Sequence, residues 1–200
     1  YSLSWAEELG VGWPWPRSLY GMIADFCARG GARALVFDVL YTEETNEDVA
    51  QNEQFGEGLR NNGRVVAAMN LATKAGQGGD EAWPAGLPKT RIAISGLDRA
   101  KLRDTDFPRA EFPITTVRDT AAFLANTNLP ADPDGVYRRE PLFSVFAGDV
   151  VPTEALAAWL LFTERRRALA VAYHPLTQVL AILGSVFLLF VRGFRFQQEL

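Results

Sequence analysis

The distribution of apolar and polar residues near the start of the chain predicts a helix that leads directly into a buried strand. Apolar side chains recur there at helical spacing, namely Leu19, Tyr20, Ile23, Phe26 and Cys27. Pro16 suits the first helical position, and Gly30 and Gly31 suit a helix end. Residues 34–37 then form a short apolar run that ends on Asp38. We therefore expect a helix over residues 16–29, with its apolar stripe facing the core, and a strand immediately after it.

A second helix and a second buried strand follow in the same order. Asn46 or Asp48 can cap a helix whose clearest core-facing residues, Phe55 and Leu59, stand four positions apart. Residues 64–69, apolar from Val65 onward, then predict a second buried strand. A strand, a helix and a strand joined by short connections favour a parallel pair with a right-handed crossover.

The pattern is less regular in the middle of the chain. Residues 71–89 are rich in Gly, Pro and Lys and predict a long surface loop that Trp83 can pin. Residues 115–125 are compatible with either a helix or a strand, and residues 136–146 predict a strand that returns antiparallel to its predecessor. A further helix is expected to begin at Thr153. The complete pattern predicts an α/β fold, with a mainly parallel sheet flanked by helices and an antiparallel strand added to it.

The last part of the chain has the composition of a membrane anchor. No Asp, Glu, Lys or Arg occurs in residues 168–191, a stretch of 24 residues. As one helix it would extend about 36 Å, which exceeds a hydrocarbon core of about 30 Å. Pro175 leaves two alternatives, a single kinked span or a shorter helix over residues 176–191 that is buried or re-entrant. We predict a transmembrane helix at about 168–191, within a membrane-anchoring segment of residues 165–200 that follows a domain of residues 1–164.

Composition narrows the classes of function. The formal net charge is −4 and no basic stripe occurs, which argues against a face that binds nucleic acid. Cys27 is the single cysteine, so no disulfide framework can form, and its apolar helix face indicates an inert thiol. His174 is the single histidine, which excludes sites built from several histidines and leaves no catalytic triad. We expect no catalytic activity, no metal and no cofactor.

Asp38 is the first candidate for a function. It stands at the carboxyl end of a predicted buried strand, the edge at which open α/β sheets bind ligands. Phosphotransfer of the Asp-x-Asp type needs a second carboxylate two residues later, where this chain has Leu40. Asp38 is better explained as a cap of neighbouring backbone or as the partner of an arginine such as Arg17. The acidic residues around Glu43 could hold a hard cation, but their position favours a solvated helix start.

The tryptophans that stand beside prolines have two interpretations of equal weight. They either line a ligand cleft or fill gaps beneath loops, and they are Trp13, Trp15 and Trp83. Because the first helix leads straight into the first strand, we expect Asp38, Glu43 and one of the first two tryptophans to lie close together at the carboxyl edge of the parallel strands. The candidate ligand-binding residues are Trp13, Trp15, Arg17, Asp38 and Glu43.

A turn is predicted at residues 132–135. The calcium loop of an EF-hand needs glycine at its sixth position, whereas Gly135 is fourth and Pro133 separates the two acids. The sequence instead predicts a tight turn with glycine at positive φ. Arg138 and Arg139 follow the turn, and an exposed pair is favoured there over an anion site.

Two groups of residues resemble the signatures of the CHASE2 sensor family. The first consists of Trp13-Pro14-Trp15-Pro16-Arg17, Tyr20, Gly31-Ala32, Phe37-Asp38-Val39-Leu40 and Glu43. The second consists of Asp132-Pro133-Asp134-Gly135-Val136, Arg138-Arg139 and Pro141-Leu142. The two groups occur in the order of the family and extend over about residues 13–159. The structural motif that this resemblance marks is Asp132, Asp134, Gly135, Arg138 and Arg139.

The resemblance implies an extracytoplasmic input domain of a bacterial receptor, a class in which membrane spans and a cyclase, kinase or similar module typically follow. It implies a place at the bacterial inner membrane, with the domain on the periplasmic or extracellular side. The expected partners are membrane lipid, a small-molecule ligand, and either a second copy of the chain or the subunits of a membrane complex. The chain departs from the family pattern at both ends, because it begins where an opening strand would have ended and contains no output module. If the chain is complete, a structural or assembly subunit is the alternative to a sensor.

Overall fold

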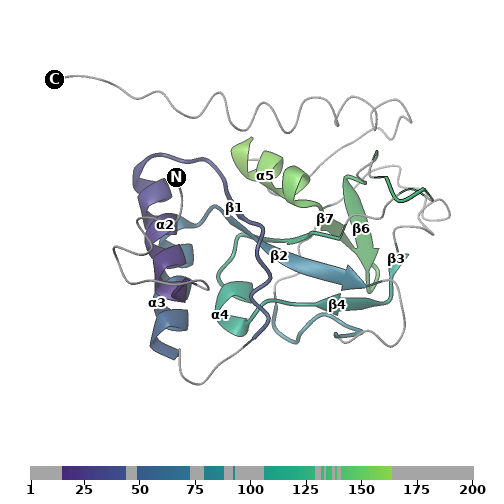
Figure 1. Ribbon diagram of the computed structural model, residues 1–200, viewed down its shortest axis with the longest axis horizontal. Coiled ribbons are helices and arrows are strands. Elements are labelled where there is room, and N and C mark those ends of the chain that lie inside the picture. The colour runs from purple at the N-terminus through teal and green to yellow at the C-terminus, as the bar shows by residue number, and fades with distance from the viewer. Residues whose placement is uncertain are drawn as a thin grey trace.

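The computed structural model describes residues 15–43, 49–72, 79–87, 92, 106–128, 132, 134–136, 138 and 141–163. These residues form a mixed α/β domain (Figure 1). Its helices and strands, in chain order, are α2 (Arg17–Arg29), β1 (Leu35–Phe37), α3 (Val49–Asn62), β2 (Val65–Ala72), β3 (Asp106–Phe107), β4 (Arg109–Glu111), α4 (Thr115–Arg118), β5 (Phe123–Asn126), β6 (Phe143–Phe146), β7 (Asp149–Pro152) and α5 (Glu154–Phe162).

Strand β2 is the centre of a four-stranded sheet. β1 and β5 both pair with it in parallel, with Val36 opposite Val66 on the β1 side. β4 pairs antiparallel with its last residues, Leu71 lying opposite Ala110. The β1–α3–β2 unit is therefore the predicted parallel crossover, but the prediction of a mainly parallel sheet is wrong. The sheet is mixed because β2 is eight residues long, and its end, beyond the reach of its short parallel partners, pairs with β4.

A second sheet has the order β3-β6-β7. β6 lies parallel to β3 and antiparallel to β7, so the expected antiparallel pairing of this strand with its predecessor is wrong. The strand is also shorter than the predicted residues 136–146. β6 and β7 form a hairpin whose loop residues, Ala147 and Gly148, have φ of 49° and 79°. Positive φ at both positions is what a two-residue type I′ turn requires.

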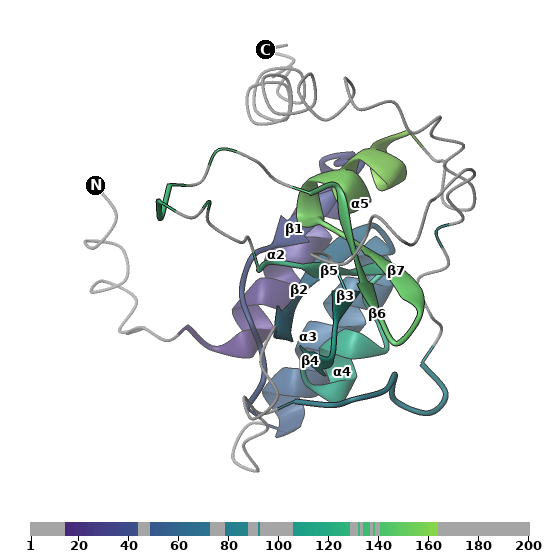
Figure 2. The same ribbon diagram turned by 90° about the vertical axis from the view of Figure 1, so that its right-hand side faces the viewer.

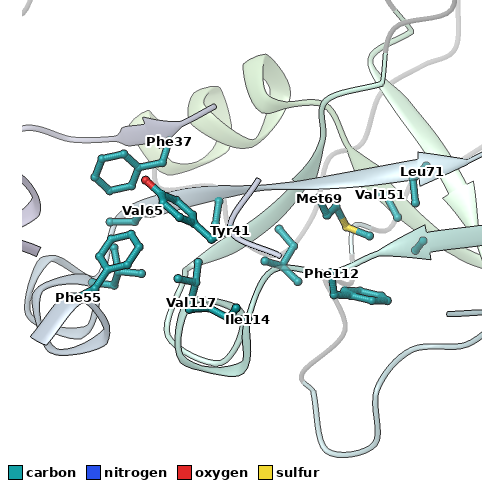
Figure 3. Packing of buried hydrophobic residues seen from close by; sticks show 14 of the residues in the cluster. Phe37, Tyr41, Phe55, Val65, Met69, Leu71, Phe112, Ile114, Val117 and Val151 are labelled. Carbon is teal, nitrogen blue, oxygen red and sulfur yellow. The ribbon is translucent and has the colours of Figure 1, made fainter. Parts of the chain in front are cut away.

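The central sheet is buried on both faces. Alternate residues of β2 point to opposite sides: Val65, Ala67, Met69 and Leu71 belong to one apolar cluster and Val66 to the other. The first cluster packs against α2, α3 and α4, and the second against α5 (Figures 1 and 2). Figure 3 shows the aromatic part of the first cluster, where Phe37, Tyr41 and Phe55 meet beside the start of β2.

Helix α2 presents only part of the predicted stripe to the core, because Tyr20 is buried and Ile23 packs against the first cluster but Phe26 does not. Its buried residues are Tyr20, Gly21 and Ala24, whereas the side chain of Phe26 is 68% exposed. A Cβ atom on Gly58 of α3 would lie only 2.5 Å from the carbonyl oxygen of Gly21. The two helices therefore pack backbone against backbone, and this contact turns the small residues of α2 inward and Phe26 outward.

Several other predicted features can be compared with the structure. The ambiguous residues 115–125 contain both alternatives, because α4 is followed by β5. Trp83 pins its loop as expected, with its ring centroid 5.3 Å from that of Phe112 and 5.7 Å from that of Phe146. The hydroxyl of Thr153 caps α5 by accepting a hydrogen bond from the backbone N–H of Leu156. No helix of the described residues is long and apolar enough to cross a bilayer, and the predicted span at 168–191 lies outside those residues.

Candidate functional site

Arg17 joins three segments near the carboxyl end of β1. Its guanidinium donates hydrogen bonds to the side-chain oxygen of Asn52, at 2.7 Å, and to the backbone carbonyl of Glu43. Its backbone N–H, one of the unpaired donors of the first helical turn, donates to the side-chain oxygen of Gln51 at 3.0 Å. Pro16 precedes α2 and offers no side-chain cap, so α3 supplies that acceptor. The start of α2, the segment after β1 and the first turn of α3 are thus held together by one residue.

An aromatic cluster lies directly behind Arg17. The ring of Tyr20 has its centroid 5.4 Å from that of Tyr41, 5.7 Å from that of Phe55 and 6.2 Å from that of Trp15. The Tyr41 side chain is buried, and its hydroxyl finds no hydrogen-bond partner of good geometry among the described residues. Burial is the main cause that raises the pKa of Tyr41, and the charge of Arg17 opposes this rise. Burial likewise raises the pKa of Tyr20. The Tyr41 hydroxyl is therefore enclosed among aromatic rings, with the Tyr20 hydroxyl and the Arg17 cation as its polar neighbours.

The structure brings together part of the predicted ligand-binding set. Trp15, Arg17 and Glu43 share this neighbourhood, and Trp15 is partly buried against the core. Asp38 follows β1 with an exposed side chain and, among the described residues, neither caps a backbone group nor pairs with Arg17. Trp13 lies outside the described residues. The contacts that Arg17 makes with Asn52 and Gln51 were not anticipated, since nothing in the sequence places the start of α3 against the start of α2.

The predicted turn at residues 132–135 has the expected glycine geometry. Gly135 has φ of 79°, and its N–H donates to the carbonyl of Asp132 at 2.8 Å. The guanidinium of Arg138 donates to the carboxylates of Asp132 and Asp134, which explains the acidic and basic members of this motif as partners of one another. These contacts lower the pKa of Asp134, with the Arg138 hydrogen bond as the largest cause. Arg139 lies outside the described residues.

Sequence reasoning missed a buried polar cluster at the carboxyl end of β5. The Asn126 side chain is 2% exposed and accepts hydrogen bonds from the backbone N–H groups of Leu71 and Asn128. Its amide donates to the carbonyl of Asn128 and to the hydroxyl of Ser144 on β6. Asn126 also forms a backbone bridge to Thr153, the cap of α5. The available signal was the Asn-Thr-Asn run that follows a buried strand, which is unusual because buried amides need several partners.

Two further features lie away from Arg17. An open depression of about 570 Å³ is lined by Asp25, Ala28, Arg29 and Asn61, at the opposite end of α2. Cys27 is partly buried, and burial raises the pKa of its thiol, which agrees with an inert cysteine. Among the described residues, no group of three or more His, Cys, Asp or Glu side chains is placed to hold a metal ion. The chemistry that the Arg17 neighbourhood offers is recognition by a cation, aromatic rings and amide groups.

Comparison with known proteins extends the resemblance to nearly the whole chain. The family model described as CHASE2 domain matches residues 2–198. The comparisons with curated proteins and with solved structures returned no match.

Proposed function

The chain belongs to the CHASE2 domain family, whose members are extracytoplasmic sensory domains, and from this premise we propose that it is the noncatalytic input domain of a bacterial membrane signalling receptor. The observation that carries the proposal is the family match over residues 2–198. The domain stands on the periplasmic or extracellular side of the inner membrane, and the charge-free residues 168–191 anchor it.

The input site of this proposal is the neighbourhood of Arg17. The guanidinium holds the Glu43 carbonyl and the Asn52 side chain, and both are neutral acceptors. A ligand that carries a carboxylate offers a stronger, charge-assisted partner for the same donors. Its binding would release the segment after β1 from the start of α2, while the partly buried ring of Trp15 offers an apolar contact to the rest of the ligand. A small organic acid is therefore the proposed class of ligand.

A paired comparison of variants tests this site. The full chain in detergent is heated with acetate, citrate or glutamate, and the midpoint of unfolding is followed. We expect at least one acid to raise the midpoint of the parent chain and of Arg29→Ala, a control at the other end of α2, but not that of Arg17→Ala. Equal shifts in all three proteins would place binding elsewhere, and no shift with any acid would contradict the ligand class.

Orientation in the membrane is tested by labelling from outside the cell. In a Cys27→Ala background, Val136→Cys introduces a thiol at a position that is 45% exposed on the domain, and Leu200→Cys introduces one at the other end of the proposed anchor. The chain is expressed in bacteria, and a membrane-impermeant maleimide is added to spheroplasts. We expect the reagent to label position 136 at once and position 200 only after lysis. The reverse pattern would overturn the extracytoplasmic placement.

The alternative function is a structural or assembly subunit of a membrane complex. It is favoured by the exposed apolar residues of α2, Met22 at 65% and Phe26 at 68% exposure, which form one side of the helix. A subunit of this kind would be recovered in a fixed ratio with other membrane proteins after cross-linking at Met22→Cys, and no acid would change that ratio. An input domain would instead be recovered with copies of itself or alone, and its cross-linking would respond to ligand.

A further inference from the structure

Helix α5 carries two exposed aromatic residues on the side that faces away from the sheet. Leu156, Leu160 and Leu161 are at most 6% exposed and pack on the second apolar cluster, whereas Trp159 and Phe162 are 43% and 46% exposed. The two aromatic residues stand three positions apart and therefore share one face of the helix. The exposure of both side chains, beside the buried leucines, shows that this face is turned away from the sheet, and Figure 2 shows α5 lying along one side of the domain.

A cation completes this surface. The guanidinium carbon of Arg33, in the connection between α2 and β1, lies 4.5 Å from the centre of the Phe162 ring. The α5 aromatic surface, which we define as Arg33, Trp159 and Phe162, thus combines a positive charge with two large rings. Tryptophan and arginine together are typical of the boundary between hydrocarbon and water, where the ring is partly desolvated and the cation meets lipid phosphate.

Chain length limits how far this surface can lie from the proposed anchor. The described chain ends at Thr163, and the charge-free segment begins at Ala168 after Arg165, Arg166 and Arg167. Five residues of fully extended chain span at most about 17 Å. A bilayer that contains residues 168–191 must therefore pass within that distance of the end of α5. No such limit applies to the exposed residues Met22 and Phe26 of α2, which are far from the anchor in sequence.

We propose that the α5 aromatic surface rests on the membrane, with Arg33 bound to the phosphate of anionic phospholipids and the rings of Trp159 and Phe162 at headgroup level. This inference rests on the proposed function, because the membrane anchor belongs to that proposal. Contact at this surface orients the whole domain, since α5 packs on β1, β2, β5 and β7. When the segment after β1 changes position, it would then move relative to a domain that α5 holds on the membrane surface.

Depth-dependent fluorescence quenching tests the contact. The full chain, in a Cys27→Ala background, is labelled with bimane at Trp159→Cys or, as a matched exposed control, at Met22→Cys. It is reconstituted in vesicles of phosphatidylcholine and phosphatidylglycerol that carry a nitroxide near the headgroup. We expect the label at position 159 to be quenched about twofold more than the label at position 22, because only the former lies at the interface. A Phe162→Cys label is expected to match position 159, which guards against a local effect of one substitution.

The results of this experiment distinguish failure of the lipid contact at α5 from failure of the membrane anchor in the proposed function. If the chain floats with the vesicles but positions 159 and 22 are quenched equally, the contact is overturned and the anchor stands. If the chain does not float, both fail. Disulfide cross-linking between two Trp159→Cys chains would place a second copy on the surface and would also overturn the lipid contact.

Charge-reversal variants test whether the lipid that binds Arg33 is anionic. Arg33→Glu is expected to reduce quenching at position 159 in vesicles with phosphatidylglycerol, whereas Arg29→Glu is expected to leave it unchanged. In vesicles of phosphatidylcholine alone, the difference between Arg33→Glu and its parent should disappear. The same reduction in both kinds of vesicle would overturn the assignment of anionic lipid as the partner of Arg33.

Discussion

At the scale of single residues, Asn126 joins the two sheets by its side chain. Its four hydrogen bonds reach backbone on β2 and after β5 and the hydroxyl of Ser144 on β6, in a site that is 2% exposed. Asn126→Ala would leave the Leu71 N–H and the Ser144 hydroxyl without a partner in a dry environment. We expect the free energy of unfolding to fall by about 2–4 kcal/mol, measured by urea unfolding of the full chain in mild detergent.

Thr127→Ala is the matched control for this prediction. The Thr127 hydroxyl lies next in sequence and, within the described part of the chain, makes only a long hydrogen bond to the Met69 carbonyl, at 3.4 Å. Its removal is expected to cost less than about 1 kcal/mol, because that side chain is partly exposed and the Met69 carbonyl keeps the hydrogen bond from the backbone N–H of Thr127. Equal losses in the two variants would show that Asn126 is not a special link.

The raised pKa of Tyr41 leads us to expect a loss of stability at high pH. Its pKa is raised in the folded chain, mainly by burial, whereas the pKa of an unfolded tyrosine is about 10. The folded state therefore holds the phenol proton more tightly, and this contribution is fully present below about pH 10 and is lost as the pH rises through the higher folded value. We expect the free energy of unfolding to fall above about pH 10, and to fall less steeply in Tyr41→Phe. Parallel pH profiles of the two proteins would contradict this account.

The sequence allowed the grouping of the residues around Arg17 to be predicted, but not the buried cluster around Asn126. Trp15, Arg17 and Glu43 could be grouped because a helix that feeds straight into a strand keeps its two flanks close together. Asn126 could not, because its partners come from segments that are distant in the sequence and meet only once both sheets are formed. Pairs of this kind are set by tertiary packing rather than by any local pattern.

At the scale of elements, α2 shows why a correctly placed helix can be given a buried face that is only partly right. Its limits were predictable from Pro16 and the two glycines at its end, but its orientation depends on Gly21 and Gly58, where the backbones of α2 and α3 meet. Hydrophobic periodicity depends on large apolar side chains and therefore contains no information about a contact between glycines. The same limitation applies to the sheet, since the length of β2 decides whether an antiparallel strand can be added, and strand ends are not marked by periodicity.

Gly58→Ala tests this helix contact. The added methyl group would lie 2.5 Å from the Gly21 carbonyl oxygen, so α2 and α3 would have to move apart. We expect the free energy of unfolding to fall by about 1–3 kcal/mol despite the better helix propensity of alanine. The control is Gly30→Ala, where φ is −73° and the nearest atom would lie 3.4 Å away, and which is expected to change stability by less than about 1 kcal/mol. An equally stable Gly58→Ala protein would refute the close approach.

At the scale of the whole molecule, the two faces of the central sheet are covered by different helices and lead to different parts of the chain. The face covered by α2, α3 and α4 carries the Arg17 neighbourhood, and the face covered by α5 leads into the predicted anchor. The sheet lies between them, and Asn126 and Thr153 connect its β5 edge to the start of α5. In the input domain proposed above, the central sheet would form the layer between the ligand site and the membrane contact.

Residues 168–191 contain no Asp, Glu, Lys or Arg, and as a helix they would extend about 36 Å, enough to cross a hydrocarbon core of about 30 Å. Arg192 and Arg195 follow, among aromatic residues, as expected where a helix leaves a bilayer. A chain that ends at Arg167 should therefore be soluble without detergent, whereas the full chain should remain in the membrane fraction after alkaline carbonate extraction. The truncated chain should keep the urea midpoint of the full chain, because every described element ends before residue 164. A full chain that is monodisperse without detergent would show that this segment is not a membrane anchor.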